Sequence, residues 1–304
     1  VQALKRGAWD YVTKPIHDMA VLESAVRRVI EHADLLRQNR EYREHLETLN
    51  NELSLTLKQL QEDEEAGRRI QFQLLPEDNL VFGNYTFQRR LYPSMYLSGD
   101  FVDYFPVDDR HVGFYMADVS GHGAASAFVT VMLNTLVTHY RDALWQSGDD
   151  TILHPQRTLQ RLNHELCRQN LDKHRTLFYG VIDLEQHTMR YSSGGQFPYP
   201  LQYDGHEVRT LECRGRPVGL FEDAEFMVWE SDLPQDCALV LVSDGILELM
   251  PEETMLRRYS TLLSGAKVAD LDLEEMTAGL DVLADKHLPD DIAFLVISRS
   301  RGNG

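Results

Sequence analysis

The stretch FYMADVSGHGAASAF, residues 114–128, joins an apolar run to a glycine-rich turn through a single acid, Asp118. Small residues in a helical pattern follow the turn. A buried strand that delivers a carboxylate to such a turn suits either a dinucleotide-binding loop or a metal site, because both place a strand end beside a charged ligand.

The dinucleotide-binding alternative fits these residues poorly. GHGAAS, residues 121–126, has Ser126 where the pattern G-x-G-x-x-G needs its third glycine. Asp118 stands at the strand end, where its charge would repel a pyrophosphate. No second strand ending in an acid follows about 20 residues later. The stretch therefore favours a metal site.

Other predicted strand ends also carry aspartates beside small residues. A lone Asp-Gly is usually a turn, but ILELM after Gly245 has no alternating pattern, so a hairpin fits poorly there. Carboxylates gathered in one place repel one another unless a cation joins them. Oxygen ligands without a Cys/His cluster favour Mg2+ or Mn2+. The acids of these strand ends are Asp100 and Asp103 in SGDFVDYF, Asp118, Asp244 in LVSDGILEL, and Asp290 with Asp291 in LPDDIAFLVI.

The composition argues against several classes of protein. A net charge of -18 over 304 residues argues against a nucleic-acid partner. No apolar run approaches about 18 residues, so we expect no membrane-spanning helix and no membrane partner. Three widely spaced cysteines form no disulfide or zinc pattern, which favours the cytoplasm, and none has the arginine of a Cys-x5-Arg phosphatase loop. The chain starts at Val1 without a visible signal peptide, so we expect part of a longer protein.

Residues 69–304 alternate short β-rich runs with helical patterns. Strands that occur in hairpin pairs, with helices between the pairs, favour antiparallel sheets covered by helices. The predicted strands are 84–92, 101–107, 110–117, 176–183, 188–193, 199–203, 226–230, 237–243 and 291–298, and the predicted helices are 124–144, 155–169, 246–249, 253–263 and 272–286.

Residues 35–68 form a predicted linker helix. Residues 35–66 lack proline and glycine and repeat apolar residues every seven positions. We interpret this repeat as a parallel coiled coil that makes a homodimer, with Gly67 as a hinge after it. The alternative is a long amphipathic helix that packs on its own domain. The heptad positions are Asn39, Leu46, Leu53 and Leu60 at a, and Leu35, Tyr42, Leu49 and Thr56 at d.

Residues 1–34 are predicted to form a helix, a strand at 10–13 and a second helix at 20–33. GAWDYVTKP, residues 7–15, resembles the last third of a bacterial response-regulator receiver domain. The resemblance implies that Lys14 is the lysine that contacts the phosphoryl group and that Pro15 follows it in cis. The phosphoacceptor aspartate would then lie upstream of this chain, and residues 1–34 would be the C-terminal remnant of a receiver domain.

Residues 69–304 resemble another family more strongly. SGDFVDYF, ADVSGHGAASA, LVSDGILE and PDDIAFLVI have the order and spacing of the PPM/PP2C-type serine/threonine phosphatases of the SpoIIE/RsbU branch. RRIQFQLLP and YSSGGQFPYPL are similar to its first helix and its glycine-rich hairpin. Ser98, residues 193–195 and Ala293 depart from the family pattern, but no carboxylate is lost. The resemblance implies an α+β fold, an αββα sandwich of two antiparallel sheets flanked by helices, preceded by a long helix or coiled coil.

The resemblance also implies roles for individual residues. Asp118 would bridge two Mn2+ or Mg2+ ions and, with Asp244, act in catalysis through metal-activated water. His122 resembles a catalytic histidine of the family only superficially, because two extra residues precede it, so we expect a structural turn residue. The implied metal ligands are Asp100, Asp118, the carbonyl of Val119, Asp244, Asp290 and, as the less favoured member of its pair, Asp291.

The implied function is hydrolysis of phosphoserine or phosphothreonine by the output domain of a response regulator. The implied substrate is a phosphorylated STAS-domain anti-sigma factor antagonist. The alternative is a non-catalytic adaptor of the RssB type, which uses a phosphatase-like domain to deliver a sigma factor to a protease. Such adaptors lack the metal acids, whereas every acid position is filled here, so we favour the enzyme. Adenylate chemistry or nucleotidyl transfer would need a basic phosphate cradle or a P-loop, and neither is visible.

Overall fold

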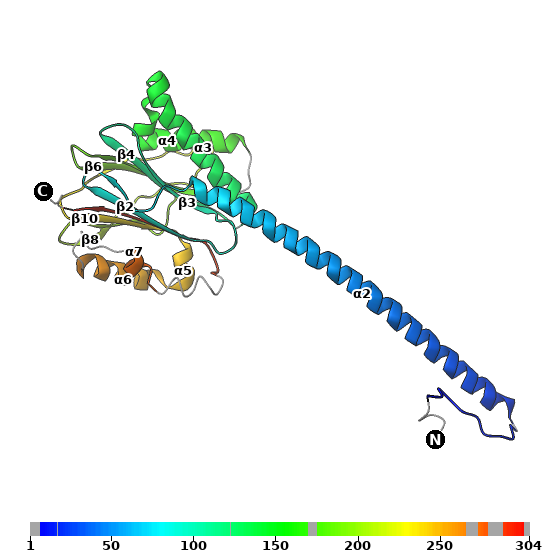
Figure 1. Ribbon diagram of the computed structural model, residues 1–304. Helices are drawn as coiled ribbons and strands as arrows, with labels where there is room; N and C mark the ends of the chain where they lie inside the picture. The colour runs from blue at the N-terminus through cyan, green and yellow to red at the C-terminus, as the bar shows by residue number, and fades with distance from the viewer. Residues whose placement is uncertain are drawn as a thin grey trace. The chain divides into compact units, whose positions relative to one another are not determined.

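The computed structural model describes residues 7–16, 18–121, 123–169, 175–265, 273–278 and 288–300. The chain divides into two compact units, residues 1–63 and 64–304. Figure 1 shows the elements of both units along the chain. No helix among the described residues combines the length and the apolarity that a membrane span requires.

The first unit is dominated by α2, which runs from Met19 to Leu74 and continues into the second unit. Within the first unit, Arg28 pairs with Asp10 at 2.6 Å, and Trp9 meets His32 edge to face. The Lys14–Pro15 peptide bond is cis, as the receiver resemblance implies. The helix expected before residue 10 falls largely on residues 1–6, outside the described residues.

Two expectations for this region are wrong. Residues 10–13 form no strand, because a strand needs a hydrogen-bonded neighbour and no described residue pairs with this segment. α2 also passes through Gly67 without a break. A single glycine inside a helix costs only about 1 kcal/mol relative to alanine, which the surrounding helix tolerates.

The second unit contains two antiparallel sheets. The strands of the larger sheet, in spatial order, are β1 (Leu80–Phe82), β2 (Tyr85–Tyr92), β11 (Ile292–Arg299), β10 (Cys237–Val242), β7 (Leu201–Tyr203) and β8 (Val208–Thr210). Those of the smaller sheet are β3 (Asp100–Pro106), β4 (His111–Val119), β5 (Arg175–Asp183), β6 (Thr188–Gly194) and β9 (Trp229–Asp232).

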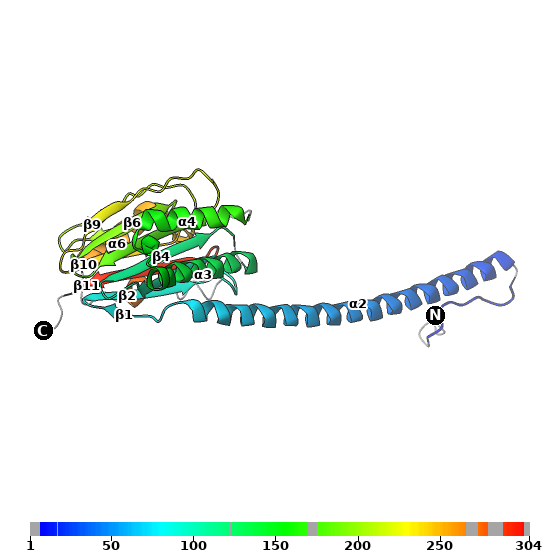
Figure 2. The same ribbon diagram turned by 90° about the horizontal axis from the view of Figure 1, so that it is seen from above.

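Helices cover the outer face of each sheet, as Figures 1 and 2 show. The smaller sheet carries α3 (Ala124–Ser147), the 3-10 helix η1 (Asp150–Leu153) and α4 (Pro155–Arg168). The larger sheet carries α5 (Gly245–Leu249), α6 (Glu252–Gly265) and α7 (Leu273–Met276). The expected αββα sandwich is therefore confirmed.

Three hydrophobic layers hold the four layers of backbone together. Successive side chains of a strand point to opposite faces of its sheet, so each strand contributes residues to two of the three hydrophobic layers. On β3, Val102 and Tyr104 lie in the layer between the sheets, whereas Phe101 and Phe105 pack under α3 and α4. β10 and β11 divide in the same way between the inter-sheet layer and the layer under α6.

The predicted elements of this unit agree with the structure except at its short pieces. β1 and β8 were not expected, because three residues are too few to show an alternating pattern. η1 was also missed. α7 covers only four residues of the helix predicted at 272–286, and residues 272 and 279–286 of that prediction lie outside the described residues.

Candidate functional site

Strand register places Asp100 and Asp118 opposite each other in the smaller sheet. Asp100 begins β3, Asp118 lies near the end of β4, and the two are paired across the antiparallel ladder. Asp100 lies two residues before Val102 on β3, and Asp118 lies two residues after Met116 on β4. The side chains of Val102 and Met116 face the larger sheet. The period of two therefore directs both carboxylates to the end of the space between the sheets.

The larger sheet brings its own acids to this end. Asp244 follows β10, and Asp290 precedes β11, with which β10 pairs in antiparallel register. Gly245 makes the close approach possible, because a Cβ there would lie 2.0 Å from the carbonyl oxygen of Asp291. The glycine of the Asp-Gly pair thus lets the start of α5 touch the backbone of the neighbouring strand.

A second glycine brings the smaller sheet's loops together. A Cβ on Gly99 would lie 2.5 Å from the carbonyl oxygen of Val119, and the Gly99 carbonyl accepts a hydrogen bond from the Val119 N–H at 3.1 Å. The Val119 side chain itself is buried under the helices. The backbone of Val119, not its side chain, therefore lies beside the loop that carries Asp100.

The acids raise one another's pKa values. Burial, and then the charges of Asp244 and Asp290, raise the pKa of Asp118 to about 8. Burial, and then the charge of Asp118, raise the pKa of Asp100 well above its ordinary value. The pKa of Asp244 is raised by partial desolvation and then by the charge of Asp290, although the residue as a whole is exposed. Asp118 and Asp244 thus lie in the field of Asp290, and Asp100 lies in the fields of Asp118 and Asp244.

Asp291 is held differently from the other acids. It is 3% exposed, and its Oδ1 accepts hydrogen bonds from the N–H of Ser94 at 2.6 Å and from the Ser94 hydroxyl at 2.8 Å. Its Oδ2 accepts the N–H of Gly99 at 2.6 Å. The carboxylate therefore ties β11 to the loop before Asp100. Both oxygens of Asp291 are therefore already engaged in hydrogen bonds within the protein.

The chemistry of the donors fits a hard divalent cation. Asp100 is 2% exposed, and its Oδ2 is buried without a hydrogen-bond partner. A buried carboxylate in the field of three others is costly, and a cation bound by oxygen ligands removes that cost. Asp118 and Asp244 instead hydrogen-bond to each other, and among the described residues no three His, Cys, Asp or Glu side chains are in ligand geometry. The acids thus converge, but among the described residues they are not arranged in the geometry of a metal-bound site.

Sequence reasoning missed the serines that support these acids. Ser243 directly precedes Asp244, and its side chain hydrogen-bonds to Asp100 and lowers the pKa of that group. The Ser243 hydroxyl also accepts the N–H of Ala293 at 2.8 Å. A serine beside an aspartate at a strand end is the only sequence signal for this role, and it is a weak one.

His122, which the sequence predicts to be a structural turn residue, lies outside the described residues.

Asp103 lies on the other side of the sheet. It is three positions from Asp100, so the strand period directs it towards α3, where the side-chain amide of Asn134 donates a hydrogen bond to its Oδ2 at 3.1 Å. Burial raises the pKa of Asp103 to about 7, while a hydrogen bond from the Tyr104 N–H and the charge of Arg141 act in the opposite direction. Asp103 is therefore a half-buried acid apart from the candidate metal site.

Asp103→Asn is expected to stabilise the protein at pH 8 but not at pH 4. Because the pKa of Asp103 is raised to about 7 from 3.8, its contribution to stability is lost as pH rises through that range. The asparagine removes the buried charge, and we expect a gain on the order of 2 kcal/mol at pH 8. Urea unfolding at both pH values measures the difference. An equal effect at the two pH values would show that Asp103 titrates normally.

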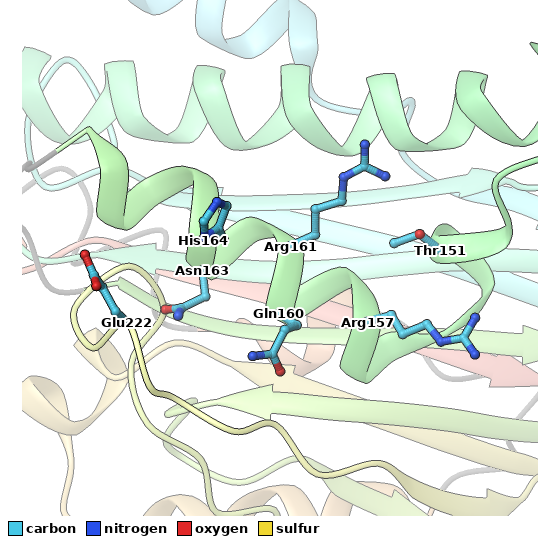
Figure 3. A pocket seen from close by; sticks show the side chains of 7 residues that line it. All are labelled: Thr151, Arg157, Gln160, Arg161, Asn163, His164 and Glu222. Atoms are coloured by element: carbon cyan, nitrogen blue, oxygen red, sulfur yellow. The ribbon is translucent and has the colours of Figure 1, made fainter. Parts of the chain in front are cut away.

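The hollow of Figure 3 lies away from the acids. It is formed by side chains on α4, by Thr151 and by Glu222 on a loop. Arg161 pairs with Asp149 at 2.6 Å, and the side-chain amide of Asn163 donates to the carbonyl of Phe221 at 2.9 Å. These groups hold η1 and the 219–224 loop against α4. We therefore place the functional site at the converging acids.

The chain is similar in sequence to two phosphoserine phosphatases. The phosphoserine phosphatase RsbP of Bacillus subtilis is 30% identical over 157 residues, which are 50% of this chain and 37% of that protein. The phosphoserine phosphatase RsbU of the same organism is 27% identical over 215 residues, or 68% of this chain and 61% of that protein. The chain thus spans less than two thirds of either relative's length.

Solved structures share the fold. The SiaA-PP2C domain of Pseudomonas aeruginosa superposes with a TM-score of 0.64 at 18% identity, covering 80% of this chain and 98% of that one. The PP2C phosphatase domain of SpoIIE from Bacillus subtilis gives 0.59 at 18% identity, covering 72% of this chain and 63% of that one. The profile of the family described as Stage II sporulation protein E (SpoIIE) matches residues 108–300. This match spans more than half of the chain and includes Asp118, Asp244 and Asp290, and the chain therefore belongs to the SpoIIE family.

Proposed function

We propose that this chain is a metal-dependent phosphatase that hydrolyses phosphoserine or phosphothreonine in a protein substrate. The convergence of Asp100, Asp118, Asp244 and Asp290 from two sheets carries the proposal. Family membership and the names of RsbU and RsbP support it. A non-catalytic adaptor would have no need to keep mutually repelling acids in one place.

Asp100, Asp118, Asp244, Asp290 and the Val119 carbonyl would hold Mn2+ or Mg2+, with two ions as the expected number. When bound, the cations offset the charge of the phosphoryl group and lower the pKa of a water molecule, so that it can attack phosphorus near neutral pH. Asp100 is buried deep in the site, whereas Asp244 lies at its exposed rim, where a substrate can approach. We assign Asp291 to positioning, because both its oxygens already accept hydrogen bonds from the 94–99 loop.

The proposed substrate is a phosphorylated STAS-domain anti-sigma factor antagonist. Similarity to the two phosphoserine phosphatases supports the phosphoserine part of this assignment. We also propose that the chain is the output part of a response regulator, with residues 1–34 as the receiver remnant. The resemblance of GAWDYVTKP, residues 7–15, to the last third of a receiver domain supports that assignment. The three cysteines are free, which is consistent with a cytoplasmic protein.

We propose a homodimer through the heptads of residues 35–66. The apolar side chains of these heptads are exposed on α2. Exposed apolar residues at heptad spacing favour association with a second helix that covers them. Leu46 is 64% exposed, Leu53 58% and Leu60 54%. A second copy of the same helix would cover them in parallel register, with Asn39 facing its equivalent.

Release of phosphate tests the proposed function. We expect the purified chain to hydrolyse p-nitrophenyl phosphate and a phosphorylated STAS-domain protein when Mn2+ is present, and EDTA to stop both reactions. Excess Mn2+ should restore them, because the acids remain in place. Absence of Mn2+-dependent phosphate release from both substrates would contradict the enzyme and favour the adaptor.

A further inference from the structure

Gln71 is a buried amide near the end of α2, within the segment RRIQFQLLP. It is 1% exposed. Its Nε2 donates to the carbonyl of Ser98 at 2.7 Å and to the hydroxyl of Thr130 at 2.9 Å, while its Oε1 accepts the N–H of Ser98 at 3.0 Å. The amide therefore hydrogen-bonds to both backbone groups of Ser98 and to α3.

These bonds complete the support of the segment Ser98-Gly99-Asp100. The N–H of Gly99 is held by Asp291, its carbonyl by the N–H of Val119, and the N–H of Asp100 by the hydroxyl of Ser98 at 3.1 Å. Gln71 supplies the remaining two partners, both at Ser98. Every backbone donor and acceptor from the N–H of Ser98 to the N–H of Asp100 is then satisfied.

Packing fixes the same contact from the helix side. Leu97, directly before Ser98, is 7% exposed, and a Cβ placed on Gly67, one helical turn before Gln71, would meet its side chain at 3.4 Å. Gln73, two residues later, is exposed. The buried face of α2 thus meets the loop of Asp100 at Gly67 and Gln71.

We propose that Gln71 is a positioning residue that fixes Asp100 for binding of divalent cations. The inference rests on the proposed metal-dependent function. Loss of the amide would leave the N–H and carbonyl of Ser98 without partners in a buried place, and the segment would have to move to satisfy them. Asp100 is two residues away, so the movement would displace a carboxylate that a cation needs. Residues that orient metal ligands in this way typically change metal affinity about 10–100-fold when replaced.

The test compares Gln71→Met and Gln71→Asn with Gln73→Leu by titration calorimetry with Mn2+ and by thermal unfolding in EDTA. Methionine keeps the length of the side chain and removes all three hydrogen bonds. Asparagine keeps the amide but is one methylene shorter, so it cannot reach all three partners and is the milder variant if Gln71→Met does not fold. Gln73→Leu changes an exposed glutamine on the same turn.

We expect Mn2+ affinity to fall at least about tenfold in Gln71→Met and less in Gln71→Asn, with Gln73→Leu unchanged. A positioning role also predicts that saturating Mn2+ restores much of kcat. The variant should then differ from the wild type mainly in the Mn2+ concentration that it needs for activity. Wild-type Mn2+ affinity in a folded Gln71 variant would overturn the inference, even if its melting temperature falls. A wild-type chain that binds no Mn2+ would overturn the proposed function as well.

Discussion

Asp118→Asn is expected to abolish Mn2+-dependent phosphate release and, at the same time, to raise the melting temperature of the metal-free protein. Asp118 lies opposite Asp100 and within the fields of Asp244 and Asp290. Outer-shell partners of metal ligands are already worth about 10–100-fold in affinity or activity, so removal of a central ligand should cost more than about 100-fold. Phosphate release from p-nitrophenyl phosphate over a range of Mn2+ concentrations measures the loss.

The gain in stability follows from the sign of the pKa shift. The pKa of Asp118 is raised to about 8 from 3.8, chiefly by burial and by neighbouring acids, so its contribution to stability is lost as pH rises through that range. Asparagine removes the charge, and we expect a gain on the order of 2 kcal/mol at pH 8 in EDTA that shrinks towards pH 4. Addition of Mn2+ should stabilise the wild type but not the variant.

Asp109→Asn is the matched control for this experiment, because Asp109 is exposed in the turn at the other end of the β3–β4 hairpin. It should change neither activity nor melting temperature appreciably. An Asp118→Asn protein that keeps Mn2+-dependent activity would remove Asp118 from the metal site. One that is less stable than the wild type in EDTA at pH 8 would show that the acids do not repel one another as the structure indicates.

The position of the acids could be predicted from the sequence largely because strands have a period of two. Asp100 begins one apolar strand, two residues before Val102, and Asp118 lies near the end of another, two residues after Met116. Val102 and Met116 both face the second sheet. The same rule separates Asp103 from Asp100, although the two stand close together in SGDFVDYF. The fold itself was expected from the resemblance of the four motifs around these acids to the phosphatase family, and not from the acids alone.

The supporting contacts could not be predicted, because they join residues that are distant in sequence. Asp291 and Asp290 look equivalent in LPDDIAFLVI, and only the folded chain shows that Asp291 binds Ser94, which lies 197 positions earlier. The clash that an alanine would make at Gly245 likewise depends on the backbone of Asp291. An Asp-Gly pair signals a turn in any sequence, and nothing local distinguishes a turn from a close approach between two strands.

Gly245→Ala is expected to disrupt the site as strongly as loss of an acid, although it removes no functional group. Its Cβ would lie 2.0 Å from the carbonyl oxygen of Asp291 and 3.0 Å from the carbonyl carbon. Backbone atoms cannot rotate away as a side chain can, so α5 and the start of β11 must separate. That movement would carry Asp244 away from Asp290. Overpacking of this kind typically costs about 1–3 kcal/mol.

Calorimetry with Mn2+ and thermal unfolding in EDTA distinguish this effect from ordinary destabilisation. Gly67→Ala serves as the control, because Gly67 lies within α2 and its added Cβ would make only van der Waals contact with Leu97. Alanine there should stabilise the protein by up to about 1 kcal/mol and leave Mn2+ binding unchanged. Gly245→Ala should lower the melting temperature and weaken Mn2+ binding together. If it binds Mn2+ like the wild type, the contact between Gly245 and Asp291 does not set the distance between Asp244 and Asp290.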